Sequence, residues 1–425
     1  MLLSFKIKNF KSIKDEVELS FEATADKSLE NAHIVKIGNY RVLKLCAIYG
    51  PNASGKTNIL IALNYLRNLI VNSATQLAPN ANTGTDPFAF NKETKTGSSE
   101  FEITFLINEI KYSYKLKLSN LTIQNEKLEY YPKGKSVVIY TRKAFEIDDR
   151  ILFQIGQGTP LHDSSFNSKN ELKTRKNIPY MSSILQIEEV PILKDVYDWF
   201  DKYLYGLVRP TQQGFPAFTS HLLEQKPEYK DYILSILSSS SFGNITEIIQ
   251  ENTQLEEEIL NLLPEEVRNN AMDDNGKIFA KQLLFKHSYG DFSANLPYNS
   301  ESRGTKRYFE LSGPLALLIK NNCMFPIDEF DTSIHPELQS FFLEEFFRYS
   351  SNSQLLITTH NTQLMDLGII RRDEIWFTDK NTKDGSTILY SLSDIKGVRK
   401  EGSYRKQYNA GKYGAKPETT VMEGF

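Results

Sequence analysis

The sequence predicts an α/β protein built on a mixed β-sheet, and three local patterns support this fold class. Apolar and polar residues alternate over 3–10 and again over 16–21, which is the period of two half-buried strands in an opening hairpin. The run 42–50 is mainly apolar, has strand length and ends in glycine, and helical spacing follows it. Alternation returns over 101–130, with a turn at Asn108-Glu109. We therefore expect a mixed sheet that includes an N-terminal antiparallel β-meander.

The segment between that strand and that helix reads GPNASGKTN. It fits the pattern GxxxxGK[ST], in which successive backbone N–H groups surround phosphates and glycines let the ligand approach. Lys56 is expected to neutralise the β- and γ-phosphates, and Thr57 to place its hydroxyl on Mg²⁺. The sequence thus predicts a P-loop NTPase that uses ATP and Mg²⁺. The expected nucleotide-binding residues of this loop are Gly50, Pro51, Asn52, Ala53, Ser54, Gly55, Lys56, Thr57 and Asn58.

An apolar run over 323–327 ends in Asp328-Glu329, the form of a Walker B strand. Asp328 is expected to hold Mg²⁺, and Glu329 to orient and deprotonate the attacking water as the catalytic base. Pro326 lies inside this run and lacks the N–H that a central strand needs, so the strand is expected to be irregular.

A second short apolar run, SQLLITTH, ends in His360. Most single histidines are structural. Here the order of strand, Asp-Glu pair, helix, strand and histidine matches the switch-histidine arrangement, in which the imidazole contacts the γ-phosphate. We therefore expect His360, together with Lys56 and Glu329, to act in catalysis.

The composition is that of a folded protein with two or three lobes, since 40% of the 425 residues are apolar and 24% are charged. A net charge of -3 argues against a protein that coats nucleic acid, although it leaves a local basic patch open. Cys46 and Cys323 lie in apolar runs, which indicates buried free thiols and a reducing compartment. No apolar run is long enough for a leader or a membrane span, so we expect a cytoplasmic protein without a membrane partner.

The middle of the chain changes to helical spacing, including 182–204, 229–239, 245–267 and 277–285. The acidic residues 256–258 and 265–266 are read as a solvated helix face, with an effector surface as the alternative. We expect no long coiled coil and find no internal repeat. The predicted organisation is a nucleotide-binding lobe over 1–149, a mainly helical insertion over 150–286, a second lobe over 287–395 and a basic C-terminal segment over 396–425.

Six landmarks in order resemble the ABC-type ATPase head of SMC, RecF and OLD-like proteins. The resemblance is closer to the small AAA-type ATPases of bacterial phage-defence operons, such as RloA, AbiL and the AriA subunit of PARIS. It spans the whole chain and is least diagnostic in the centre. It implies a P-loop NTPase of ABC/SMC-head type, in which two heads enclose the nucleotide and each phosphate loop is closed by the partner's signature segment. The landmarks are FKIKNFKSIKDEVELSF, GPNASGKTN, ESRGTKR, IDEFDTSIHP, TTHNTQLMD and YNAGKYGAKP.

Two segments could serve as the signature that this resemblance implies. Ser312-Gly313 looks more like the LSGG form, but it leaves no room for a helix before Asp328. Ser302 with Gly304 lies further upstream, and 308–319 can form the intervening helix, kinked at Pro314. We therefore predict that Ser302 and Gly304 contact the nucleotide, because a hydroxyl and the N–H groups of a helix N-terminus suit a γ-phosphate.

The resemblance also places Asp331 and Ser333 at the D-loop, which crosses the dimer interface in the family. His335 is a family landmark, and we expect a structural or interface role for it, because no second His or Cys stands at ligand spacing. No Q-loop glutamine is present over 88–91.

The first functional hypothesis is a slow, regulated ATPase that dimerises around nucleotide, with higher oligomers open, and acts as sensor and scaffold in anti-phage defence. The 65 residues after His360 are too few for the Toprim nuclease domain of OLD proteins. The resemblance therefore implies a separate effector subunit, often a Toprim-type nuclease, and a phage protein or nucleic acid as trigger.

The alternative is a RecF-like DNA-binding ATPase of repair or recombination. It relies on the basic segment 396–416, in which Tyr404, Tyr408 and Tyr413 could stack on bases. A flexible solvated tail explains these charges equally well. A third hypothesis is a nucleotide-locked scaffold that seldom hydrolyses ATP, against which Glu329 argues.

Overall fold

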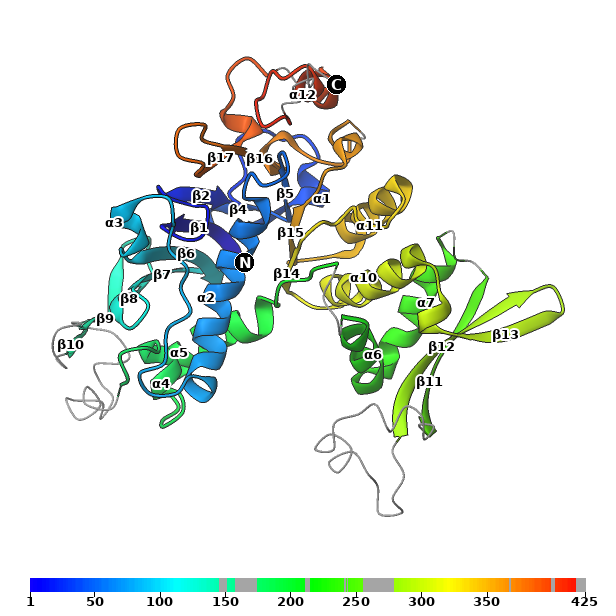
Figure 1. Cartoon of the computed structure of the whole chain (residues 1–425), viewed down its shortest axis with the longest axis horizontal. Coiled ribbons are helices and arrows are strands. Elements are labelled where there is room, and N and C mark those ends of the chain that lie inside the picture. Colours follow the sequence, from blue (N-terminus) through cyan, green and yellow to red (C-terminus); the bar gives the residue numbers. More distant parts are fainter. Residues whose placement is uncertain are drawn as a thin grey trace, which may run out of the picture. The chain divides into compact units, whose positions relative to one another are not determined.

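The computed structural model places the chain in two compact units (Figure 1). The first unit comprises Met1–Pro210, Leu318–Asp331 and Ser340–Phe425 and contains the phosphate loop. The second comprises Thr211–Leu317 and Thr332–Gln339. The structure describes residues 1–144, 151–156, 174–210, 215–240, 242, 244–254, 279–366, 368–398 and 402–417.

A five-stranded sheet in the order β14-β15-β5-β16-β17 forms the centre of the first unit. The first four of these strands are parallel, and β17 pairs antiparallel with β16. Both β5 and β15 are buried along their whole length, as expected for parallel strands covered on two faces. The strands are β5 (Leu45–Tyr49), β14 (Met324–Ile327), β15 (Gln354–Thr358), β16 (Ile375–Lys380) and β17 (Thr387–Ser391).

A seven-stranded antiparallel sheet accompanies it, in the order β10-β9-β8-β7-β6-β1-β2. The predicted opening hairpin is confirmed, because β1 pairs with β2, and the predicted turn at Asn108-Glu109 joins β6 to β7 with positive φ at both residues. The strands are β1 (Leu2–Lys8), β2 (Val17–Ser20), β6 (Ser99–Ile107), β7 (Ile110–Leu118), β8 (Ile123–Tyr131), β9 (Val137–Ala144) and β10 (Ile151–Ile155).

Helix α2 (Lys56–Gln76) lies beside β1 of the antiparallel sheet (Figure 1). Its buried face contributes Ile59, Leu63, Leu66 and Ile70 to a core that also holds residues of both sheets. This packing fixes the helix that begins at the phosphate loop. Further helices of the unit are α1 (Glu30–His33), α3 (Lys92–Lys95), α4 (Tyr180–Ile184), α5 (Pro191–Asp198), η2 (Trp199–Tyr203), η5 (Thr362–Met365), η6 (Arg372–Glu374), η7 (Leu392–Asp394) and α12 (Tyr404–Asn409).

Two expectations for this unit change. The run 42–50 is not one strand: β4 (Tyr40–Leu43) pairs with β3 (Ile34–Ile37), and β5 starts after Lys44, whose ammonium donates to the Ser350 carbonyl. Pro326 is accommodated because β14 is the edge strand of its sheet. The Pro326 carbonyl accepts from the Val208 N–H, so the Pro326 nitrogen also faces the segment around Val208. The missing N–H of the proline therefore costs no hydrogen bond to β15.

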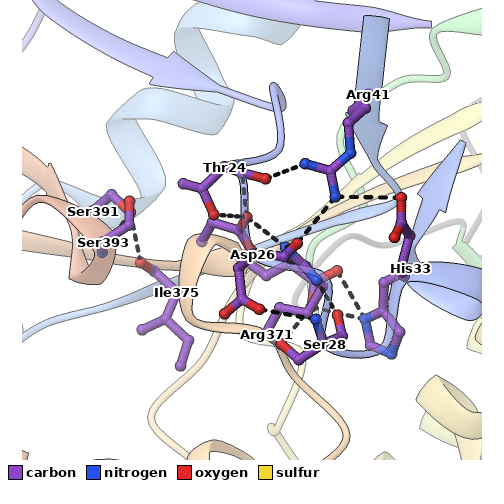
Figure 2. Close-up of polar contacts among 12 residues, drawn as sticks. Thr24, Asp26, Ser28, His33, Arg41, Arg371, Ile375, Ser391 and Ser393 are labelled. Atoms are coloured by element: carbon purple, nitrogen blue, oxygen red, sulfur yellow. Dashed lines mark hydrogen bonds and ion pairs between the residues drawn. The ribbon is translucent and has the colours of Figure 1, made fainter. Parts of the chain in front are cut away.

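A buried polar cluster ties the segment before β3 to the turn η6 before β16 (Figure 2). The Arg371 guanidinium binds both oxygens of Asp373, at 2.9 and 2.7 Å, and donates to the carbonyls of Asp26 and Ser28. His33 contacts the Glu374 carboxyl at 2.9 Å, and burial raises the pKa of Glu374. Because Arg371 and Asp373 are both almost inaccessible to solvent, each depends on the other for its charge to be compensated.

The second unit contains helices and a three-stranded antiparallel sheet in the order β11-β12-β13. The helical prediction for 245–254 and for 279–285 is wrong, because these residues lie in β11 and β12. Their apolar spacing fits a helix and a buried strand alike, and pairs such as Ile248 with Phe285 across the ladder favour the strand. The elements are α6 (Phe215–Gln225), η3 (Pro227–Tyr229), α7 (Lys230–Ser238), β11 (Ile245–Gln254), β12 (Phe279–Tyr289), β13 (Phe292–Pro297), η4 (Tyr298–Ser300) and α10 (Arg303–Lys320), whose last residues enter the first unit.

The unit boundaries also differ from the predicted ones. The second unit begins at Thr211 rather than at 150, so β10, α4, α5 and η2 belong to the nucleotide-binding unit. The helical predictions over 182–204 and 229–239 are confirmed by α4, α5, η2, η3 and α7. The acidic residues 256–258 and 265–266 lie outside the described residues. Helix α11 (Pro336–Tyr349) begins in the second unit and ends in the first.

Both cysteines are buried free thiols, as predicted. Within the part of the chain that the structure describes, no helix has both the length and the hydropathy that a bilayer span requires.

Candidate functional site

The phosphate loop follows β5 and ends where α2 begins at Lys56. Gly50 and Gly55 have positive φ values of 152° and 104°, which side chains rarely adopt. A Cβ on Gly50 would lie 2.3 Å from the Thr378 carbonyl oxygen, and one on Gly55 would lie 2.0 Å from the Thr387 hydroxyl. Both glycines are therefore required by backbone conformation and by space.

Lys56 is buried at the first position of α2. Its ammonium group contacts the loop and donates to the carbonyls of Gly50 at 2.9 Å and Pro51 at 3.0 Å. Burial lowers the pKa of Lys56, and the nearby carboxylates, Asp328 first among them, partly offset that effect. The positive charge is thus held at the position where a P-loop binds phosphate.

Thr57 and Asp328 bring the two halves of the predicted site together. The Thr57 hydroxyl donates to the Asp328 carboxylate at 3.0 Å, and the Thr358 hydroxyl donates to the same oxygen at 2.6 Å. Hydroxyl and carboxylate oxygens are ligands that Mg²⁺ accepts beside phosphate and water. In the described part of the chain no three His, Cys, Asp or Glu side chains gather as a metal site of their own. Thr57 and Asp328 thus place two oxygen atoms of the kind that Mg²⁺ accepts side by side.

Glu329 stands directly after β14 with a φ of 47°, a left-handed conformation that is uncommon for a side-chain-bearing residue. Its N–H donates to the Thr358 hydroxyl at 2.8 Å, and its side chain is exposed. Thr358 thereby fixes both residues of the acidic pair. Sequence reasoning missed this role, although Thr358 belongs to the TTH landmark.

His360 follows β15, and its N–H donates to the Asp331 carboxylate at 3.0 Å. Partial burial and then the Lys56 charge lower the pKa of His360, while Asp331, Glu329 and Asp328 act in the opposite direction. Lys56 and Glu329 thus both influence the charge of His360, and Glu329 and His360 follow the carboxyl ends of the parallel strands β14 and β15. Ligands bind at this end in α/β sheets.

Ser302 lies in the second unit as the exposed residue before α10. Its hydroxyl accepts from the Thr305 N–H at 3.1 Å, the geometry of a helix N-cap. The helix starts at Arg303, earlier than expected, and continues through Pro314. A Cβ on Gly304 would lie 3.3 Å from the Ser333 carbonyl oxygen, which brings the predicted signature segment close to the predicted D-loop.

The alternative signature Ser312-Gly313 lies inside α10. Ser312 is buried and donates to the Phe309 carbonyl, so its hydroxyl cannot reach a partner. Gly313 is needed for packing, because a Cβ there would lie 2.4 Å from the Thr219 hydroxyl of α6. His335 accepts from the Glu337 N–H at 3.3 Å at the start of α11, which is a structural contact.

The C-terminal segment 402–417 packs against β16 and β17, so the alternative of a flexible tail does not hold for these residues. Tyr408 and Tyr413 are buried against Phe377: the Tyr408 ring is stacked on it at 5.4 Å between centroids, and the Tyr413 ring is tilted at 5.8 Å. They are therefore not available to stack on bases. Arg399 and Lys400 lie outside the described residues, whereas Lys406, Lys412 and Lys416 are exposed.

A family model described as "AAA domain, putative AbiEii toxin, Type IV TA system" matches residues 45–366, which is well over half of the chain. The chain belongs to this AAA-domain family. The matched range includes the phosphate loop, the acidic pair and His360. The predicted P-loop NTPase fold, with its mixed α/β architecture and antiparallel strands, is confirmed. The family is an ATPase-type, nucleotide-binding one.

Two solved structures are similar to this AAA-domain protein. One is described as the SMC head domain from Thermotoga maritima, with 14% sequence identity, a TM-score of 0.41, and coverage of 92% of this chain and 98% of that chain. The other is described as the SmcHead bound to the C-winged helix domain of ScpA, with 13% identity, a TM-score of 0.41, and coverage of 92% and 99%. No curated protein matches the chain.

Proposed function

We propose that this AAA-domain protein binds and hydrolyses ATP with Mg²⁺. The observation that supports this most directly is the Thr57–Asp328 contact beside the buried ammonium of Lys56. It sets two oxygen ligands and one fixed positive charge around a glycine loop, which is the donor set that a Mg²⁺–triphosphate complex requires. The loop N–H groups and the residues Gly50 to Asn58 would carry the phosphates.

In this proposal each residue has one task. Lys56 binds the β- and γ-phosphates, and Thr57 and Asp328 hold Mg²⁺, which supplies charge neutralisation when bound. Glu329 accepts the proton of the attacking water, and the Thr358 hydroxyl positions Glu329 by accepting a hydrogen bond from its backbone N–H. His360 contacts the γ-phosphate. Steady-state release of phosphate by the purified protein tests the proposal, and the absence of Mg²⁺-dependent release would contradict it.

We further propose that two copies enclose the nucleotide, Ser302 and Gly304 of one copy facing the phosphate loop of the other. An exposed serine at the N-terminus of α10 supports this, because first-turn N–H groups lack intrahelical partners and favour an anion. Asp331 and Ser333 would lie at the same interface. Both a homodimer and higher assemblies fit this arrangement.

The cellular role that we propose is a slow sensor and scaffold ATPase in anti-phage defence. It would hold a separate effector, often a Toprim-type nuclease in the proteins that the chain resembles, until a phage protein or nucleic acid triggers it. The family description, which names a toxin of a toxin–antitoxin system, fits a protein that restrains or delivers a harmful activity. The test is phage plating on cells that carry the gene with its neighbours, comparing the parent with Lys56→Ala.

A RecF-like DNA-binding ATPase is the second candidate. The observation in its favour is the segment 403–416, which contains four basic and no acidic residues, with Lys406, Lys412 and Lys416 exposed. The burial of Tyr408 and Tyr413 removes the stacking contribution and leaves only phosphate contacts. DNA affinity that falls steeply with salt, together with DNA-stimulated ATPase activity, would favour this candidate.

A further inference from the structure

Three hydroxyl side chains from outside the phosphate loop surround it. Thr378 of β16 pairs with the Ser54 hydroxyl at 2.6 Å, and Thr387 of β17 donates to the Ser54 carbonyl at 2.9 Å. Ser12, between β1 and β2, lies 2.7 Å from the Thr387 hydroxyl. Ser54, Thr378 and Thr387 are almost completely buried, so each bond is costly to lose.

The donors in this group form one directional chain. Asn58 donates its amide N–H to the Ser12 hydroxyl at 2.6 Å. The Thr387 hydroxyl donates its only proton to the Ser54 carbonyl. In the Ser12–Thr387 contact the Ser12 hydroxyl must therefore be the donor. The chain therefore runs from α2 through the β1–β2 loop and β17 back to the phosphate loop, and Thr387 is its central member.

Strands β16 and β17 form a hairpin, and its backbone contacts the β1–β2 loop and lies close to the phosphate loop. The Thr387 N–H donates to the Ser12 carbonyl at 2.8 Å, which fixes β17 at this position. The predicted clashes of a Cβ at Gly50 with Thr378, and at Gly55 with Thr387, show how close the approach is. The hairpin β16–β17 lies beyond residue 366, outside the range that the family model matches.

The other side of the hairpin carries the C-terminal segment. Tyr390 of β17 donates to the Tyr413 carbonyl at 2.6 Å, and Asp379 of β16 accepts from the Ala415 N–H at 2.9 Å. Gly414 permits this approach, because its φ is 69° and a Cβ there would lie 2.9 Å from the Tyr390 hydroxyl. The segment thus supports the hairpin from the side opposite the loop contacts.

We propose that Thr387 is a positioning residue for nucleotide binding. It holds the phosphate loop in its phosphate-accepting conformation, with Thr378 and Ser12 as partners, so the hairpin β16–β17 and the segment docked on it set nucleotide affinity. The inference rests on the proposed ATP binding. It adds that residues without a phosphate contact keep the loop preformed. This raises affinity, because ordering the loop in advance removes an entropic cost of binding.

The test compares full-length variants by equilibrium titration with a fluorescent ATP analogue and Mg²⁺. Thr387→Val keeps the side-chain shape and removes the hydroxyl, and we expect binding to weaken about tenfold. Thr387→Ser restores the hydroxyl and should bind within about twofold of the parent. The matched control is Thr382→Val, an exposed threonine in the turn of the same hairpin, which should bind like the parent.

A merely structural role would lower the thermal midpoint of Thr387→Val without changing affinity, and that result overturns the inference. In turnover experiments a positioning role raises KM about tenfold and changes kcat by less than about threefold. If Thr387→Val does not fold, Ser12→Ala tests the inference instead. We expect it to bind the analogue about threefold more weakly, and binding with parental affinity would contradict the inference. Failure of the parent itself to bind the analogue would remove the proposed function, whereas parental binding with no effect of either variant removes only this inference.

Discussion

The Thr57 hydroxyl donates to the Asp328 carboxylate at 3.0 Å across 271 residues of sequence. This contact joins the end of β14 to the start of α2, and the proposed metal site needs a residue from each of these two segments. It also determines which variants are informative, because each partner can be changed while Gly50 and Gly55 stay in place.

Asp328→Asn should abolish most hydrolysis. An amide keeps the hydrogen-bonding shape but removes the charge that holds Mg²⁺, so we expect kcat to fall by about two to three orders of magnitude. Thr57→Ser, which keeps a hydroxyl at the same position, is the matched control and should retain most activity. The measurement is phosphate release as a function of Mg²⁺ concentration. Parental turnover by Asp328→Asn would exclude this residue from the metal site.

Lys56→Ala and Glu329→Gln should separate binding from chemistry. Loss of the Lys56 charge is expected to weaken ATP binding by at least about a hundredfold, since a buried charge-assisted contact is lost. Glu329→Gln should bind ATP like the parent but hydrolyse it about a hundredfold more slowly, because the proton acceptor is gone. Titration calorimetry and phosphate release measure the two effects. If Glu329→Gln hydrolysed ATP at the parental rate, the base would be another residue.

ATP affinity should depend on alkaline pH. Burial lowers the pKa of Lys56 below its ordinary 10.5 in the nucleotide-free protein, so its ammonium loses the proton at a lower pH than an exposed lysine does. Phosphate binding needs the charged form. Affinity should therefore weaken as pH rises, by up to about tenfold per pH unit, and the weakening should begin below pH 10.5. Affinity that stays constant up to pH 10.5 would contradict this assignment of Lys56.

Local patterns made much of the fold and the centre of the site predictable. The hairpin at Asn108-Glu109 and the strand, loop and helix around Lys56 depend on neighbours in the sequence. The contacts of Thr387 and Thr378 with Ser54 could not be anticipated, since each spans more than 300 residues and a single hydroxyl has no sequence signature. For β11 and β12 the apolar spacing fits both a helix and a strand, and only the pairs across the two strands favour the strand.

The buried cluster of Figure 2 should contribute strongly to stability. Arg371→Met leaves the Asp373 carboxylate buried without its guanidinium partner, and we expect unfolding free energy to fall by about 3–5 kcal/mol. Lys36→Met removes a largely exposed partner of Glu30 and should change stability by less than about 1 kcal/mol. Urea denaturation of both variants measures the difference. Equal stabilities would mean that water reaches Asp373 and compensates its charge.

Ser302→Arg should separate nucleotide binding from self-association. A large cation at the exposed start of α10 obstructs the surface that is proposed to face the partner's phosphates, while the phosphate loop of the same chain is unchanged. We therefore expect Glu329→Gln to form a dimer with ATP in light scattering, and the double variant Ser302→Arg, Glu329→Gln to bind ATP as a monomer. Lys320→Ala, at the exposed opposite end of the same helix, is the control and should leave the dimer intact. An ATP-dependent dimer of the double variant would show that Ser302 lies away from the interface, and that the copies, if they enclose nucleotide at all, do so through another surface.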